Sequence, residues 1–173
     1  MSDELIHIET PFEFSESNRQ EVNELIQRYP VKEAAMLPVL HVAQKQAGYI
    51  TPGVMRHVAE LLEVSVMKVK DVVTFYPMFF EEPVGEYVIR VCYTLPCALR
   101  DCKLVLDHLK EKLGTDIASE TDLAKGTTGD GKFTILKSEC LASCDVAPVM
   151  MVNDDLYKNL TPEKVDEILG GLT

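Results

Sequence analysis

The sequence has no long run of apolar residues. Its apolar runs extend over only a few positions, whereas an α-helix needs about 20 such residues to cross a bilayer. The N-terminal stretch MSDELIHIET also lacks the basic and apolar segments of a secretory signal, and it carries no lipidation motif. These absences predict a protein that is soluble when isolated, intracellular and not itself inserted in a membrane.

Basic residues are scarce as well. The chain has 17 Lys and Arg against 28 Asp and Glu, which gives a formal net charge of −11 over its 173 residues. A protein with this charge is repelled by the phosphates of nucleic acids and by anionic lipid surfaces. We therefore expect no nucleic-acid partner.

The cysteines follow neither the C-x-x-C pattern of a thiol–disulfide enzyme nor, with histidine, the C-x-H pattern of a Rieske centre. There are 5 of them, an odd number, and all lie in the second half of the chain. Thiols stay free in a reducing compartment, so metal binding or redox chemistry is favoured over structural disulfides. The cysteines are Cys92, Cys97, Cys102, Cys140 and Cys144.

The hydrophobic residues from residue 15 to about residue 76 recur with the period of α-helices. Ser17 and Gln20 have the spacing of a capping box at the start of a first helix. Thr51, followed by proline, and Ser65 have the chemistry of the N-caps of two later helices. The pattern predicts a small helical bundle.

The period changes after a stretch rich in proline, glycine and glutamate near residues 77 to 85. We expect strands there, alternating with helices, and hence an α/β sheet with helices on its faces. The predicted elements are a strand over 86–93, a helix over 98–114, a loop over 114–131, a strand over 132–139, two strands within 147–160 and a last helix capped by Thr161 and Pro162.

Two pairs of cysteines follow two of these predicted strands. Cys92 ends the first strand and Cys97 begins the helical region after it, with the turn YTLP between them. Cys140 and Cys144 come directly after a later strand, so both pairs can meet at one edge of the sheet. Cys102 instead falls on the apolar stripe of its helix, where a free cysteine packs as a small hydrophobic side chain.

The spacing alone leaves the identity of the bound group open. Structural zinc sites with four thiolates are commonly built from C-x2-C pairs, and the C-x4-C and C-x3-C pairs here suit zinc less well. A [2Fe–2S] cluster needs two thiolates on each iron, so one pair per iron is a natural supply. Redox thiols and plain core packing are the remaining interpretations.

Several stretches carry a resemblance to a known family, and they cover nearly the whole chain in the order LPVLHVAQKQAGYI, VTFYPMFF, VCYTLPCALRD, GDGKFTI, ECLASCDVAPVMMVNDD and LTPEKVDEIL. They resemble the E-subunit family of the proton-pumping NADH:quinone oxidoreductase, respiratory complex I. The resemblance implies an N-terminal helical bundle over residues 1–84, including its leading tail and linker. It implies a thioredoxin-like [2Fe–2S] ferredoxin domain over residues 85–173.

The resemblance also implies the ligands of the cluster. By motif, Cys92 and Cys97 would bind one iron, and Cys140 and Cys144 would bind the other. Cys102 lies where the family pattern needs no ligand. One [2Fe–2S] cluster is therefore the expected cofactor of this chain.

The function implied is that of an electron-transfer subunit that exchanges electrons with FMN. In the family, FMN and the NADH site belong to a partner flavoprotein subunit, so the isolated chain would be an electron carrier without its own substrate site. The protein would lie in a peripheral arm on the cytoplasmic side of the inner membrane. Alternatives are the equivalent subunit of an NAD-linked hydrogenase or formate dehydrogenase, a zinc-stabilised scaffold and a thiol–disulfide enzyme.

Overall fold

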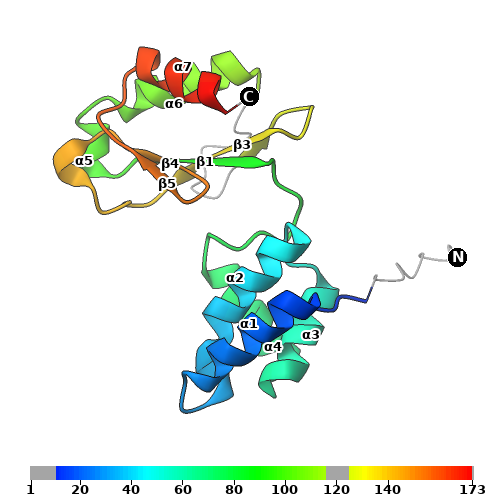
Figure 1. Ribbon diagram of the computed structural model, residues 1–173. Coiled ribbons are helices and arrows are strands. Elements are labelled where there is room, and N and C mark those ends of the chain that lie inside the picture. Colours follow the sequence, from blue (N-terminus) through cyan, green and yellow to red (C-terminus); the bar gives the residue numbers. More distant parts are fainter. Residues whose placement is uncertain (1–10, 116–124, 173) are drawn as a thin grey trace, which may run out of the picture. The chain divides into compact units, whose positions relative to one another are not determined.

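The computed structural model describes residues 11–115 and 125–172, and the chain divides between Pro83 and Val84 into two compact units (Figure 1). The first unit is helical, and the second is a mixed sheet with helices. The predicted fold class, a helical bundle followed by an α/β domain, is confirmed.

The helical unit consists of α1 (Glu16–Gln27), the 3₁₀ helix η1 (Lys32–Ala35), α2 (Met36–Ala47), α3 (Pro52–Leu62) and α4 (Val66–Phe75). Its core is aliphatic, and Val39, Leu40 and Val58 have no exposed surface. Burial of each such side chain contributes about 1.5–3 kcal/mol of transfer free energy. The bundle therefore has a core of its own.

The helix starts follow cap chemistry, with one correction to the sequence-based prediction. The N-cap of α1 is Ser15 and not Ser17, because the Ser15 hydroxyl accepts the backbone N–H of Asn18 at 3.3 Å. Thr51 and Ser65 are the N-caps of α3 and α4, as predicted. Each hydroxyl satisfies a backbone N–H that has no partner within the first helical turn.

The segment after α4 folds back onto the helical unit. The Gln44 side chain on α2 donates to the carbonyl of Met78 at 2.8 Å and accepts the backbone N–H of Phe80 at 2.8 Å. Phe79 lies between them and is only 5% exposed. One amide side chain thus fixes the backbone on both sides of a buried aromatic ring.

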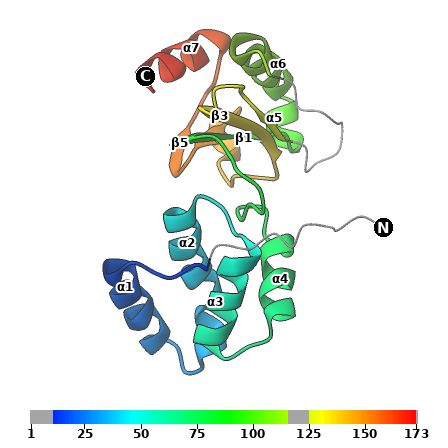
Figure 2. The same cartoon turned by 90° about the vertical axis from the view of Figure 1, so that its right-hand side faces the viewer.

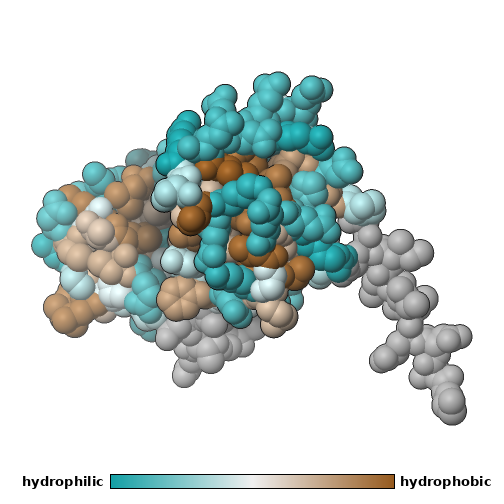
Figure 3. All heavy atoms as spheres, turned by 90° about the horizontal axis from the view of Figure 1, so that it is seen from below, coloured by the Kyte–Doolittle hydropathy of each residue, from teal (hydrophilic) through white to brown (hydrophobic). Residues whose placement is uncertain are grey.

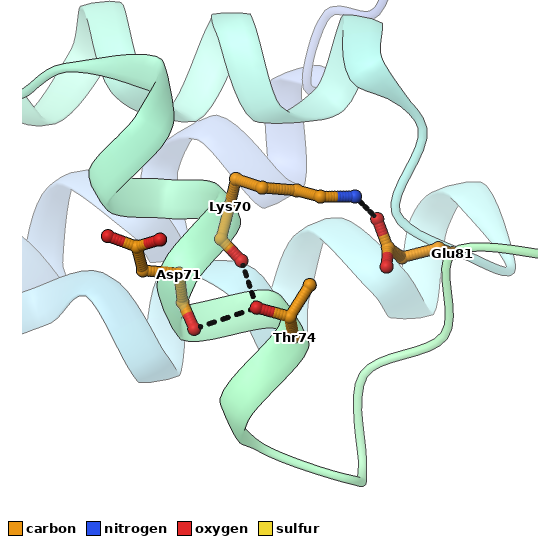
Figure 4. A network of polar contacts seen from close by, with 4 residues as sticks. All are labelled: Lys70, Asp71, Thr74 and Glu81. Atoms are coloured by element: carbon orange, nitrogen blue, oxygen red, sulfur yellow. Dashed lines mark hydrogen bonds and ion pairs between the residues drawn. The ribbon is translucent and has the colours of Figure 1, made fainter. Parts of the chain in front are cut away.

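Figure 4 shows the polar contacts of α4, one of which reaches the segment that follows the helix. Lys70 forms an ion pair with Glu81, beyond the end of the helix. The Thr74 hydroxyl donates to the carbonyls of Lys70 and Asp71 at 2.9 and 3.2 Å. These groups are exposed, so the ion pair adds little to stability, of the order of 0–1 kcal/mol.

The second unit contains the sheet. In chain order it has β1 (Tyr87–Cys92), α5 (Leu95–Ala98), α6 (Cys102–Leu113), β2 (Lys125–Thr127), β3 (Phe133–Ser138), the 3₁₀ helix η2 (Cys144–Val146), β4 (Met150–Val152), β5 (Asp155–Tyr157) and α7 (Pro162–Gly171). The strand order is β2-β3-β1-β4-β5. β1 and β3 are parallel, and the other neighbours are antiparallel. α6 and α7 lie side by side on one face of the sheet (Figures 1 and 2).

Two elements of this unit differ from the prediction. Strand β2 lies in a stretch predicted as loop, of which residues 116–124 fall outside the described part of the chain. The helix predicted over 98–114 begins only at Cys102, because Asp101 adopts a left-handed backbone conformation with φ of 58° that separates α5 from α6. The helix ends before Gly114, as predicted. The peptide bond between Ala147 and Pro148, ahead of β4, is cis.

Within the described ranges, no helix has both the length and the apolar character needed to span a bilayer. On the face drawn in Figure 3, hydrophilic and hydrophobic residues are interspersed.

Gly85 provides a test of how β1 is anchored at its start. A Cβ added there would lie 2.6 Å from the carbonyl carbon of Phe133, and the Gly85 N–H donates to the buried Thr134 hydroxyl at 2.6 Å. We expect Gly85→Ala to lower the free energy of unfolding by about 1–3 kcal/mol, because backbone atoms cannot move aside cheaply. Urea denaturation checks this result.

Gly129→Ala is the matched control. A Cβ at Gly129 has no atom within 4 Å, so its effect should stay within about 0.5 kcal/mol. Equal unfolding midpoints for the two variants would contradict the close approach of Gly85 to the Phe133 backbone.

Candidate metal centre

The first cysteine pair lies where β1 passes into α5. Cys92 is the last residue of β1, and Cys97 is the third residue of the short helix. Proline at the second position of α5 suits a helix start, because its missing N–H would have no helical partner there. Both thiols are buried, each at 1% exposure.

The second pair follows β3. Cys140 comes two residues after the end of the strand, and Cys144 begins η2. Their Sγ atoms lie 3.7 Å apart, and both residues are exposed. The backbone N–H of Ala142, which lies between them in the chain, donates to the Cys140 Sγ at 3.4 Å. The loop therefore forms a hydrogen bond with one of its own thiols.

Parallel pairing brings the two segments together. Cys92 lies opposite Ser138 in the register of β1 and β3, and the backbone N–H of Tyr93 donates to the Ser138 carbonyl at 3.2 Å. Because the strands are parallel, both cysteine pairs leave the sheet at the same edge. The sheet thus joins two sequence segments that lie far apart in the chain.

The surroundings of the buried pair act differently on its two thiols. Burial raises the pKa of Cys92, but hydrogen bonds from the Thr94 hydroxyl and from the backbones of Leu141 and Thr94 outweigh it, and the pKa is lowered. Burial, together with the neighbouring Cys92 thiol, raises the pKa of Cys97 to about 11. Cys92 is therefore the readier of the two to become a thiolate, the form that binds metals.

Thr94 contributes to this environment and was not anticipated from the sequence. Its hydroxyl lies 3.4 Å from the Cys92 Sγ. Its position two residues after a strand-ending cysteine was the only available signal, and threonine in a turn has many other uses.

The two cysteine pairs lie near each other, but they do not surround a single metal position. The hydrogen bond with Cys140 is the main cause that raises the pKa of Cys144, and the charge of Cys92 adds to it, so the pairs are within electrostatic reach. Among the described residues, however, no three His, Cys, Asp or Glu side chains converge on one metal position. The donors are arranged as two pairs rather than as a single tetrahedron.

Cys102 is buried on the apolar stripe of α6, as predicted. In the structure its 6% exposed side chain packs in a small cluster with Cys92, Cys97, Ala147 and Val149. A third buried thiol therefore lies beside the first pair.

The donor set suits an iron–sulfur cluster. Thiolates are soft ligands, typical of zinc and iron–sulfur groups. A closed zinc site needs four donors around one point, whereas a [2Fe–2S] cluster takes two thiolates on each of two irons. One pair on each of two adjoining segments fits the second requirement better.

Known proteins resemble this chain over most of its length. A family model described as thioredoxin-like [2Fe-2S] ferredoxin matches residues 22–173. The E subunit of NADH-quinone oxidoreductase from Rickettsia bellii is 40% identical over 166 residues, which cover 94% of this chain and 95% of that protein. The protein of the same name from Mycobacterium bovis is 38% identical over 152 residues, covering 88% of this chain and 58% of that protein.

A solved structure shares the fold. The chain superposes on an air-oxidised NAD+-reducing [NiFe]-hydrogenase with a TM-score of 0.64 and 16% sequence identity, over 79% of this chain and 22% of the hydrogenase chain. This likeness supports the fold alone.

The burial of the thiols gives a prediction for the metal-free protein. Cys140 and Cys144 are exposed and the other three cysteines are buried. We expect iodoacetamide to modify the exposed pair about ten-fold faster or more, because a buried thiol reacts only after local opening. Mass spectrometry of peptides after timed quenching measures each rate, and the urea-unfolded chain is the control. Labelling of Cys92 or Cys97 as fast as that of Cys144 would contradict the described site.

Proposed function

We propose that the chain, which belongs to the thioredoxin-like [2Fe–2S] ferredoxin family, is an electron-transfer subunit of an NADH-quinone oxidoreductase. It aligns over nearly its whole length with E subunits of such enzymes. The observation that carries the proposal is the placement of two cysteine pairs at one edge of a parallel strand pair. When bound, a [2Fe–2S] cluster supplies a one-electron carrier.

We assign the ligands by pair. Cys92 and Cys97 would hold one iron, and Cys140 and Cys144 the other. The buried pair is enclosed by apolar neighbours, among them Ala147 and Val149, which keep water from that side. The exposed Cys140–Cys144 loop is then the side that a redox partner can approach.

Negative charge surrounds the exposed side. Glu139 and Asp145 lie directly next to Cys140 and Cys144 in the chain. Carboxylates beside an anionic centre disfavour the addition of an electron. We therefore expect a low reduction potential, about −400 mV as in plant-type clusters.

The partner in this proposal is a flavoprotein subunit of the same complex. NADH would react at FMN in that subunit, and this chain would exchange single electrons with the flavin. The assembly would lie in a peripheral arm on the cytoplasmic side of the inner membrane. The relatives with 38–40% identity favour an NADH-quinone oxidoreductase as host, because the 16% identity to the hydrogenase concerns fold only.

Single substitutions test the ligand assignment. The metal-free chain is reconstituted anaerobically with iron and sulfide, and we expect visible absorption, equal amounts of iron and sulfide, and an EPR signal after dithionite reduction. Serine in place of Cys92, Cys97, Cys140 or Cys144 should lower the cluster content strongly, because one of the two irons then loses a thiolate.

Cys102→Ala is the matched control, since it removes a buried thiol from the same cluster of side chains. Its spectrum should equal that of the wild type. Loss of the chromophore in this variant would contradict the assignment, and stoichiometric zinc without a chromophore in the wild type would favour the scaffold alternative.

A second experiment tests the exchange with flavin. The reconstituted chain is mixed with the FMN-bearing flavoprotein from the same organism, and NADH is added anaerobically. We expect the cluster absorption to bleach only when both proteins are present, because this chain has no proposed NADH site. Bleaching by NADH without the flavoprotein would argue against the proposal that NADH reacts only in the partner subunit.

A further inference from the structure

Two residues next to the proposed ligands face each other across the sheet edge. Tyr93 directly follows Cys92, and Glu139 directly precedes Cys140. The β1–β3 ladder ends at the pair Cys92 and Ser138, so Tyr93 and Glu139 are the first residues beyond the paired strands. Parallel register therefore brings them to the same place, although nothing in the local sequence relates them.

The two side chains form a hydrogen bond. The Tyr93 hydroxyl donates to Oε1 of Glu139 at 2.7 Å, a short distance of the kind that a charged acceptor gives. The Lys137 ammonium lies 6.0 Å from the centre of the Tyr93 ring, at the outer limit of a cation–π contact. The phenol is thus fixed from both its hydroxyl and its ring face.

The hydrogen bond between Tyr93 and Glu139 lies where the backbone pairing of β1 and β3 ends. One further backbone bond, from the N–H of Tyr93 to Ser138, follows the last strand pair. Beyond it the segment with Cys140 turns into an exposed loop in which Ala142 has a left-handed φ of 55°. A side-chain bond at this point restrains the loop against the buried segment.

We propose that Tyr93 and Glu139 are positioning residues, which clasp the segment carrying Cys92 and Cys97 to the segment carrying Cys140 and Cys144. This inference rests on the proposed function, because it assigns the clasp a task only if both segments hold the same cluster. The clasp restrains the two thiol-bearing segments against each other. It acts through the cysteines and touches no substrate.

The test measures cluster retention. Wild type and variants are reconstituted, and the loss of visible absorption is followed anaerobically after addition of an iron chelator. Tyr93→Phe removes the hydroxyl and keeps the ring, and Glu139→Ala removes the acceptor. We expect each to lose the cluster about five-fold faster, which corresponds to one hydrogen bond. The double variant should be no faster than the faster single variant, because both changes remove the same bond.

Two further variants separate the bond from the charge and from the ring. Glu139→Gln keeps an oxygen that can accept the Tyr93 hydroxyl, so its retention should return to nearly the wild-type rate. Its reduction potential should rise as it does in Glu139→Ala, since both variants lose the same negative charge, whereas Tyr93→Phe should leave the potential unchanged. Tyr87→Phe, at the other end of β1, is the matched control and should retain the cluster as the wild type does.

The outcomes are distinct. Wild-type retention in Tyr93→Phe, or loss in Glu139→Gln as fast as in Glu139→Ala, would overturn the clasp while leaving the proposed function intact. Failure of the wild type to take up any cluster would overturn the proposed function, and the clasp with it. Both sides of the bond are tested independently, so the inference stays testable even if one variant does not fold.

Discussion

The parallel pairing of β1 with β3 is the constraint on which the site depends. In a parallel pair both carboxyl ends leave the sheet at the same edge, so the residues that follow Cys92 and Ser138 must emerge side by side. An antiparallel arrangement of the same strands would place the two cysteine pairs at opposite ends. The two cysteine pairs are far apart in the sequence, and the hydrogen bonds between β1 and β3 bring them together.

The two pairs then meet different surroundings. Cys92 and Cys97 are buried among small apolar side chains, whereas Cys140 and Cys144 lie on an exposed loop. A redox centre needs both features, because burial on one side limits access by water and exposure on the other permits a partner to approach. The asymmetry follows from the position of each pair: Cys92 and Cys97 pack with Ala147 and Val149, whereas Cys140 and Cys144 lie in the loop and the 3₁₀ helix η2 that follow β3.

The sequence predicted what depends on local chemistry and failed where distant groups decide. The end of the helix at Gly114 could be predicted because glycine readily adopts the left-handed backbone conformation. The same conformation at Asp101 could not be predicted, since residues other than glycine adopt it much less often. β2 was missed because three residues carry too short a pattern and its pairing with β3 is tertiary. Burial of Cys102 followed from its helix stripe, but its packing beside Cys92 arises only in the folded chain. The hydrogen bond from Tyr93 to Glu139 likewise depends on the register of β1 and β3.

In the proposed site, one cluster is shared by the two cysteine pairs. Anomalous diffraction from crystals of the reconstituted protein, collected at the iron absorption edge, tests it most directly. We expect paired iron peaks, with Cys92 and Cys97 on one iron and Cys140 and Cys144 on the other. A single metal peak at the zinc edge, or Cys102 in place of one of the four ligands, would contradict it.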